Sequence, residues 1–215
     1  DSDVELDDAE QCTANAFSWN QECSDGTCVV NHARAWPGFA IDISLQALVF
    51  YGGQGSNAEP FIQMTSTKVV GERCTTNTCR NSIPPNRYKH GMTHKSDDGS
   101  IVRILVFGGV LEASDTLTDE LWLFDGDQWE QLCAGLNPCT VDNTGDGQAN
   151  QGASGPTARA LAVFQYEPNT NLFWVFGGED STGLLNDLWS FDYTSMRWTR
   201  HDCTWSACTV PTARQ

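Results

Sequence analysis

The residues best suited to chemistry in this sequence are its nine cysteines. Such thiols could close disulfide loops or bind a metal ion. Structural zinc usually takes the spacing C-x2-C, which is absent here, so the spacings favour disulfides. Cys12 is left over, and we expect it to pair with a cysteine outside this segment or in a neighbouring chain. The other eight form four close pairs: Cys23 with Cys28, Cys74 with Cys79, Cys133 with Cys139, and Cys203 with Cys208.

A second candidate site is the stretch of residues 140–155, which is rich in glycine and asparagine. It contains the run Asp-Asn-Thr-Gly-Asp-Gly, in which Asp142 and Asp146 offer carboxylates and glycine allows a sharp turn, as in a calcium loop. The twelfth position of that loop is Ala153, which has no carboxylate. The sequence therefore favours a flexible surface insertion, with calcium at Asp142 and Asp146 as the alternative and no other cofactor expected.

Arginine recurs behind proline in the form P-x-x-R, at residues 84–87, 156–159 and 211–214, while Arg34 follows a version without the proline. A guanidinium could bind an acidic ligand. Its recurrence at one position of a repeat instead favours structural hydrogen bonds to carbonyls or carboxylates between neighbouring units. The sequence contains neither a G-x-S-x-G nucleophile motif nor an H-E-x-x-H zinc motif.

The net charge of −16 limits the classes of partner. We expect no nucleic-acid partner, because binding to a phosphate backbone needs clustered Lys and Arg. Cations, basic proteins and neutral glycans are compatible with the charge. No apolar stretch reaches the roughly 18 residues that a membrane span requires. Residues 1–16 are interpreted as an acidic, solvated N-terminal segment, with binding of cations or a basic partner as the alternative.

The elements that must position these residues are short β-strands. Apolar runs end in paired glycines at residues 47–53, 104–109 and 173–178, which is typical of a buried strand that turns where no side chain fits. Two of these runs are followed by the pattern Leu-Trp-x-Phe-Asp, at 121–125 and 188–192, and then by a lone tryptophan. The first copy departs from that pattern. Together the copies predict an array of repeated small sheets.

This repeat resembles the kelch repeat, which has an arginine-led strand, an apolar strand ending in Gly-Gly, an Asp-Leu-Trp strand and a closing strand with tryptophan. The resemblance covers nearly the whole chain after residue 16. It implies an all-β fold in which each repeat is one four-stranded blade of a kelch-type β-propeller. Three blades alone would leave two open edges. We therefore expect about three blades of a larger or multi-chain propeller, within a longer polypeptide or completed by other chains.

On this resemblance the chain divides into successive units. Residues 17–28 are predicted to hold the closing strand of a preceding blade and a disulfide loop, and residues 209–215 the start of a following blade. The blades between them are predicted at 29–79, 80–139 and 140–208, with 140–155 as a loop inserted in the last. Each cysteine pair then lies in the connection between two blades. His90 occupies a frequent kelch position and is expected to be structural.

Four predicted disulfides indicate a secreted or cell-surface protein, because such bridges persist in oxidising compartments. The kelch resemblance implies a structural or protein-interaction module rather than an enzyme, with other proteins or further copies of this chain as partners. In kelch propellers the turns after Gly-Gly and the inter-blade connections open on one face. We expect binding on that face, with a basic partner or a bridging cation favoured by its acidic residues Glu112, Asp115, Glu179 and Asp180.

Two alternatives remain open. Glycan recognition would need an exposed aromatic ring, for which Trp205 in the last cysteine loop is the candidate. Galactose oxidase also has kelch-type blades, with copper held by Tyr and His. No Tyr and His grouping can be matched to it residue by residue, and a shared fold does not transfer function.

Overall fold

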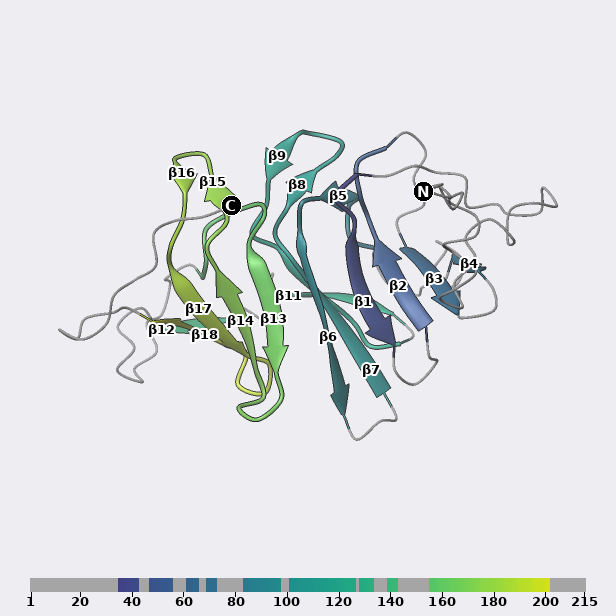
Figure 1. Cartoon of the computed structure of the whole chain (residues 1–215). Coiled ribbons are helices and arrows are strands. Elements are labelled where there is room, and N and C mark those ends of the chain that lie inside the picture. Colours follow the sequence, from purple (N-terminus) through teal and green to yellow (C-terminus); the bar gives the residue numbers. More distant parts are fainter. Residues whose placement is uncertain are drawn as a thin grey trace, which may run out of the picture.

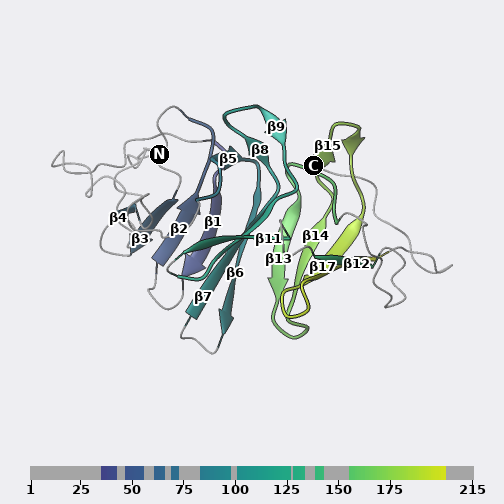
Figure 2. The ribbon, with the colours of Figure 1, turned by 180° about the vertical axis from the view of Figure 1, so that it is seen from behind.

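The computed structural model is all β, and the described part of the chain contains no helix (Figure 1). The structure describes residues 35–42, 47–55, 61–65, 69–72, 83–97, 101–126, 128–133, 139–142 and 155–201. Three sheets stand next to one another, and in the view from behind they appear in the reverse order from left to right (Figure 2). This architecture is that of successive blades of a β-propeller, as the sequence predicts.

The first two blades are four-stranded antiparallel sheets. Blade 1 consists of β1 (Gly38–Asp42), β2 (Ala47–Tyr51), β3 (Phe61–Thr65) and β4 (Val69–Glu72). Blade 2 consists of β6 (Gly91–Asp97), β7 (Ile101–Phe107), β10 (Leu121–Phe124) and β11 (Trp129–Leu132).

Blade 3 has the same antiparallel core and one additional strand. Its core consists of β13 (Val163–Glu167), β14 (Leu172–Phe176), β17 (Leu188–Asp192) and β18 (Arg197–His201). The additional strand, β12 (Thr140–Asp142), pairs in parallel with β18 at the outer edge. The sequence predicts only a loop from residue 140 onward, and here the structure differs. Pairing is favoured because Val141 is buried and Asp142 forms an ion pair with Arg197.

Small hairpins extend blades 2 and 3 at the same end of the molecule, which we call the upper face (top of Figure 1). In blade 2, β8 (Val110–Leu111) and β9 (Thr116–Leu117) pair with each other, and β8 also pairs with β5 (Arg87–Tyr88). In blade 3, β15 (Glu179–Asp180) pairs with β16 (Gly183–Leu184). The turns that follow Gly-Gly therefore gather on one face.

Alternating side chains of each blade pack against its neighbours. Between blades 1 and 2, Val49 and Tyr51 pack with Val106, Phe124 and the fully buried Trp129. A second core of the same kind lies between blades 2 and 3, and its largest members are Phe107, Phe164, Phe173, Trp189, Phe191 and Trp198. Burial of each such side chain contributes about 1.5 to 3 kcal/mol. Packing of blade on blade is therefore the main stabilising term.

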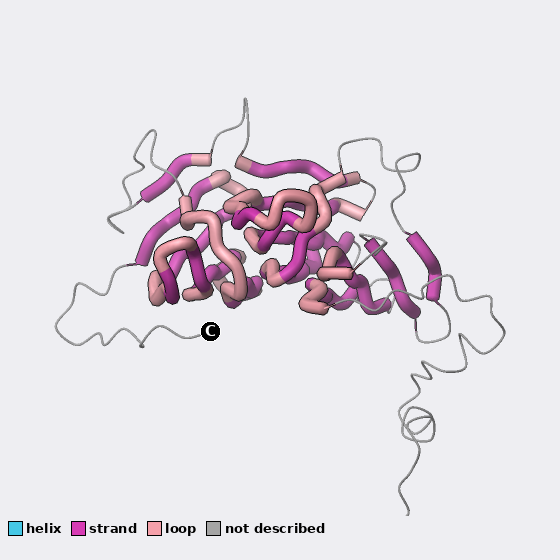
Figure 3. The backbone as a smooth tube through the Cα atoms, turned by 90° about the horizontal axis from the view of Figure 1, so that it is seen from above, coloured by secondary structure: helices cyan, strands magenta, loops and turns pink. Residues whose placement is uncertain are grey.

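The innermost strands of the three blades, β1, β6 and β13, lie side by side. Seen from above, the sheets fan out from these strands (Figure 3). A cavity of about 440 Å³ lies on them, with Phe39, Ile41 and His94 among its lining residues. Phe39 and Ile41 are 62% and 47% exposed, so the inner side of blade 1 is apolar and open in the described part of the chain.

Candidate interaction face

The P-x-x-R segments, which we call connectors, are fixed first by their arginine side chains. Arg87 is fully buried and donates from Nε to the carbonyl of Pro85 (3.1 Å) and from Nη1 to the carbonyl of Gly108 (3.2 Å). Its Nη2 lies 2.5 Å from the carboxylate of Glu120, which also accepts from the indole of Trp122 (2.9 Å). One guanidinium thus links the connector, the Gly-Gly turn after β7 and the residue that precedes β10 in blade 2.

Arg159 makes the same bonds in blade 3. It donates to the carbonyls of Thr157 (2.9 Å) and Gly177 (3.1 Å) and forms a two-pronged ion pair with Asp187 at 2.5 and 2.8 Å. The indole of Trp189 donates to Asp187 as well (2.7 Å). Burial alone favours the neutral carboxylic acid, but the bonds from Arg159 and Trp189 together with the charge of Arg159 lower the pKa of Asp187.

The backbone of each connector, in contrast, bonds to the preceding blade. The carbonyl of Arg87 accepts from the amide of Gly53 in blade 1 (2.8 Å), and the carbonyl of Arg159 accepts from the amide of Gly109 in blade 2 (2.8 Å). The sequence analysis expects the arginine side chains to bond between units. At Arg87 this holds for a side-chain hydrogen bond to Tyr51 of blade 1, whereas the other side-chain bonds described above stay within the arginine's own unit and the carbonyl reaches across.

Paired glycines are required where the connector crosses. Gly108 and Gly109 have φ values of 66° and 93°, which disfavour any residue with a Cβ atom. A Cβ on Gly108 would also lie only 2.6 Å from the carbonyl oxygen of Arg159. The Gly-Gly motif therefore serves the junction between blades as well as the turn of its own strand.

His90 is buried beneath the first junction. Its ring packs edge-on against Tyr51, with ring centroids 5.4 Å apart. Neither ring nitrogen has a hydrogen-bond partner among the described residues. Burial, and then the nearby charge of Arg87, lower the pKa of His90 to about 3. The ring is therefore neutral at physiological pH, which agrees with a structural role.

Two of the predicted binding residues, Glu112 and Asp115, connect the β8–β9 hairpin of blade 2 to neighbouring segments by hydrogen bonds. The carboxylate of Glu112 accepts from the side-chain amide of Asn86 and from the backbone amide of Gly55 in blade 1 (3.2 Å). Asp115 accepts from the hydroxyl of Tyr88 (2.6 Å), and this bond raises the pKa of Tyr88. Both carboxylates remain exposed on the upper face.

The other two predicted binding residues lie on the hairpin of blade 3. Glu179 forms an ion pair with Lys89 at 3.7 Å. Asp180 accepts from the amide (2.7 Å) and hydroxyl (2.6 Å) of Thr182, and these bonds lower the pKa of Asp180. The four acidic residues thus share the upper face and come from two successive blades, as the sequence predicts for kelch turns.

An aromatic residue that the sequence analysis does not single out completes this face. Trp36 is 52% exposed, and Lys89 lies over its ring at 5.1 Å from the centroid. The ring of Tyr88 lies 6.3 Å from that of Trp36. Trp36 has a φ of 52°, and it stands at the connector position that Lys89 and Leu161 occupy in the next two units, with φ values of 56° and 57°. The repeat register was the signal that could have identified it.

The candidate glycan residue Trp205 lies outside the described residues, as does Asp146 of the calcium hypothesis. Asp142 is 1% exposed, and one of its oxygens accepts from Arg197 at 2.9 Å. Groups of three or more His, Cys, Asp or Glu side chains that could hold a metal ion do not occur among the described residues.

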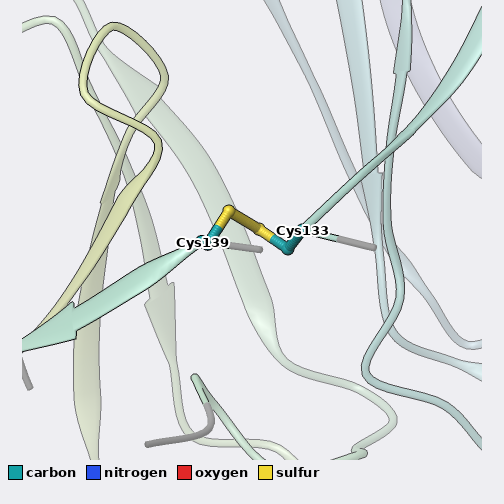
Figure 4. Close-up of a disulfide and its surroundings, with 2 residues drawn as sticks. All are labelled: Cys133 and Cys139. Atoms are coloured by element: carbon teal, nitrogen blue, oxygen red, sulfur yellow. A yellow bond between two sulfur atoms is a disulfide. The ribbon is translucent and has the colours of Figure 1, made fainter. Parts of the chain in front are cut away.

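Of the four predicted disulfides, the one between Cys133 and Cys139 is present (Figure 4). It closes the connection between β11 and β12, and both cysteines pack against the core between blades 2 and 3. A cavity of about 270 Å³ beside it is lined by Glu120, Trp198 and the disulfide itself, among others. The remaining predicted pairs and Cys12 lie outside the described residues.

A family model for the KLHDC2/KLHL20/DRC7 kelch-repeats domain matches residues 38–215. The chain belongs to the kelch-repeat family. A comparison with curated proteins finds no individual match. Kelch domains are typically non-catalytic and mediate protein interactions. For this kelch chain, helices long and apolar enough to cross a membrane are absent from the described residues.

A serine and a histidine do meet in blade 3 of this kelch domain, where Ser190 Oγ lies 2.8 Å from Nε2 of His201. Ser190 is only 4% exposed, and the ring of Trp174 packs against that of His201 with centroids 4.8 Å apart and an angle of 38° between the rings. A nucleophile must be reached by its substrate, whereas this hydroxyl is enclosed by neighbouring strands. The pair is therefore best explained as a cross-strand structural contact.

Proposed function

We propose that this kelch domain is an interaction module that binds a basic protein segment through its upper face. The observation that carries the proposal is that the exposed ring of Trp36 contacts Lys89 and Tyr88, the partners of Glu179 and Asp115, on the face that also carries Glu112 and Asp180. Complementary charge steers a basic partner to such a face, and an exposed indole supplies apolar contact and cation–π attraction.

The hydrogen bonds of these carboxylates support a binding role, because they fix the conformation of the loops while the carboxylates keep their negative charge. Asp180 keeps its negative charge even in mildly acidic solution, since its bonds to Thr182 lower its pKa. Lys89 offsets part of the charge and also covers one side of the Trp36 ring. A Lys or Arg of the partner could replace Lys89 over that ring at little entropic cost, since the acceptor groups are already positioned.

We further propose that the protein works in a secretory, extracellular or cell-surface setting. The disulfide between Cys133 and Cys139 supports this proposal, together with the three similarly spaced cysteine pairs in the sequence. Disulfides of this kind are rare in reducing compartments. Self-association of copies of this chain is an alternative function of the same module.

Glycan recognition is the second candidate function, and the exposure of Trp36 favours it. Sugar rings stack on exposed indoles, and acidic side chains beside the indole can accept hydrogen bonds from sugar hydroxyls. Such binding would depend on Trp36 but only weakly on salt, whereas binding of a basic peptide depends on both.

The proposal can be tested by selecting ligands from a displayed library of random peptides on the native protein. We expect the selected peptides to be rich in Lys and Arg. The variant E112Q/E179Q removes one charge from each hairpin, and the matched control E130Q/E167Q removes two charges elsewhere, from the exposed Glu130 and the half-buried Glu167. At about 0.5 to 1 kcal/mol per charge, the first variant should weaken binding roughly five- to thirtyfold.

The control variant should bind the selected peptides as tightly as the native protein does. Equal affinity of all three proteins would show that the upper face is not the binding surface. A different result would favour the glycan-type aromatic site over the acidic one. In that case the selected peptides would lack basic residues, and their binding would be insensitive to salt but abolished by W36A.

A further inference from the structure

The aromatic part of the upper face is assembled across the junction between blades 1 and 2, which we call the first junction. Trp36 comes directly before blade 1, whereas Lys89 over its ring and Tyr88 beside it come directly before blade 2. The amide of Lys89 donates to the carbonyl of Trp36 (3.2 Å), and the amide of Gly53 donates to the carbonyl of Arg87 (2.8 Å). These contacts exist together only while the first junction is closed.

His90 follows Lys89 in the sequence, and its ring lies inside the first junction. A Cβ atom on Gly38 would clash with Nε2 of the ring, and one on Gly52 would lie 3.0 Å from Cε1. The ring also packs edge-on against Tyr51 of blade 1. Opening of the first junction therefore separates the imidazole from the backbone and the aromatic ring that bury it.

The junction between blades 2 and 3, the second junction, has the same backbone bonds without the imidazole. The amide of Gly109 donates to the carbonyl of Arg159 (2.8 Å), and the amide of Leu161 donates to the carbonyl of Lys89 (2.8 Å). Counted from the connector arginine, Ala162 stands where His90 stands in the preceding unit. An alanine side chain does not titrate, so the second junction is a natural control for the first.

The surroundings of the His90 ring disfavour its protonated form. Burial has the largest effect, and the positive charge of Arg87 adds to it, although Arg87 is itself paired with Glu120. The neighbouring backbone groups of Arg87 and Tyr51 favour the protonated form less strongly. Burial also raises the pKa of the Tyr51 hydroxyl, which therefore stays neutral. From β1 the ring meets a glycine, which does not titrate, and His94 of β6 lines the same cavity as His90.

We propose that His90 makes the first junction open preferentially in mild acid, so that pH controls whether the Trp36 site is assembled. This inference rests on the proposed function of the upper face. The closed junction lowers the pKa of His90 to about 3, whereas a ring exposed by opening titrates near its ordinary pKa of 6.5.

The sign of the effect follows from proton binding. The open form binds more protons than the closed form, so the stabilisation of the closed form is complete above pH 6.5 and is lost as the pH falls toward 3. With pKa values of about 3 and 6.5, the ratio of open to closed molecules should rise about 25-fold between pH 7 and pH 5.

The test is amide hydrogen exchange of the full chain, followed by NMR at pH 7 and pH 5. Protection factors are compared, because they cancel the direct effect of pH on the chemical exchange rate. Those of Gly53 and Lys89 at the first junction should fall about 25-fold, and those of Gly109 and Leu161 at the second should stay the same. In the H90Q variant the fall at the first junction should disappear.

Two results would overturn the inference. Unchanged protection of Gly53 and Lys89 would show that the first junction does not respond to acid. An equal fall at both junctions would show that exchange follows unfolding of the whole domain, and not a local opening. The second junction of the native protein provides this comparison even if H90Q does not fold.

A basic peptide selected on the native protein separates this inference from the proposed function. At a concentration of 100 times its Kd, a peptide that binds only the closed form should raise the protection of Lys89 at pH 5 by about 100-fold. A first junction that responds to pH but is not protected by the bound peptide would confirm the acid-sensitive junction and refute the upper face as the binding surface. Protection by the peptide without any response to pH would do the reverse.

Discussion

Replacement of Arg159 by methionine should test the connector more severely than any other single change. The substitution R159M removes the partner of Asp187 and leaves the carbonyls of Gly177 and Thr157 without their donors. Loss of one partner from a buried ion pair costs about 3 to 5 kcal/mol. Because the Asp187 side chain is 20% exposed and water can partly solvate it, we expect a loss of about 3 kcal/mol in the free energy of unfolding.

The assay is urea unfolding followed by tryptophan fluorescence, with D187N and the double variant completing a thermodynamic cycle. We expect a coupling free energy of about 1.5 to 3 kcal/mol between the two side chains. The matched control is K89M, which breaks a half-exposed ion pair of 3.7 Å and should cost less than about 1 kcal/mol. A loss below about 1 kcal/mol for R159M would refute the view that this guanidinium holds the blade together.

Three further predictions follow from the junctions and the disulfide. G109A should destabilise the fold by several kcal/mol, because a Cβ would lie 2.8 Å from the carbonyl oxygen of Tyr88 at a φ of 93°; G126A, with a φ of 104° and open space around it, should cost only about 1 kcal/mol in the same urea titration. His90 binds a proton near pH 6.5 when unfolded and near pH 3 when folded, so its contribution is complete above pH 6.5 and is lost as the pH falls toward 3. Unfolding at pH 5 should therefore show about 2 kcal/mol less stability than at pH 7, a difference that H90Q should reduce and that an unchanged pH profile in H90Q would contradict. C133S/C139S should lower the free energy of unfolding by about 2 kcal/mol, and a stability equal to that of the native protein would show that this bridge does not restrain the unfolded chain.

The repeat architecture could be predicted because its signals are local. Apolar runs that end in Gly-Gly, and tryptophans at fixed offsets from Asp or Glu, are set by strand alternation and by turn geometry within each unit. The placement of Glu112, Asp115, Glu179 and Asp180 on one face also follows from the repeat, because equivalent turns of stacked units point the same way. Neither feature depends on contacts between residues that are far apart in the sequence.

What could not be predicted depends on contacts between units. The role of Trp36 depends on Lys89 of the next connector, and nothing in its own neighbourhood distinguishes an exposed indole from a packed one. Strand β12 depends on the outer edge of β18, which is more than fifty positions away in the sequence. Whether an arginine bonds across a junction by its side chain or by its carbonyl is likewise decided only when two blades are packed together.

Fluorine NMR of protein labelled with fluorotryptophan can show directly whether the upper face is the binding surface. The W36F variant assigns the resonance of Trp36, and the probe is a basic peptide selected on the native protein. Addition of the peptide should shift or broaden the Trp36 resonance and leave those of Trp122 and Trp189, which are held in the arginine clusters, unchanged. Saturating binding with no change at Trp36 would place the binding surface elsewhere on the molecule and contradict the proposed function.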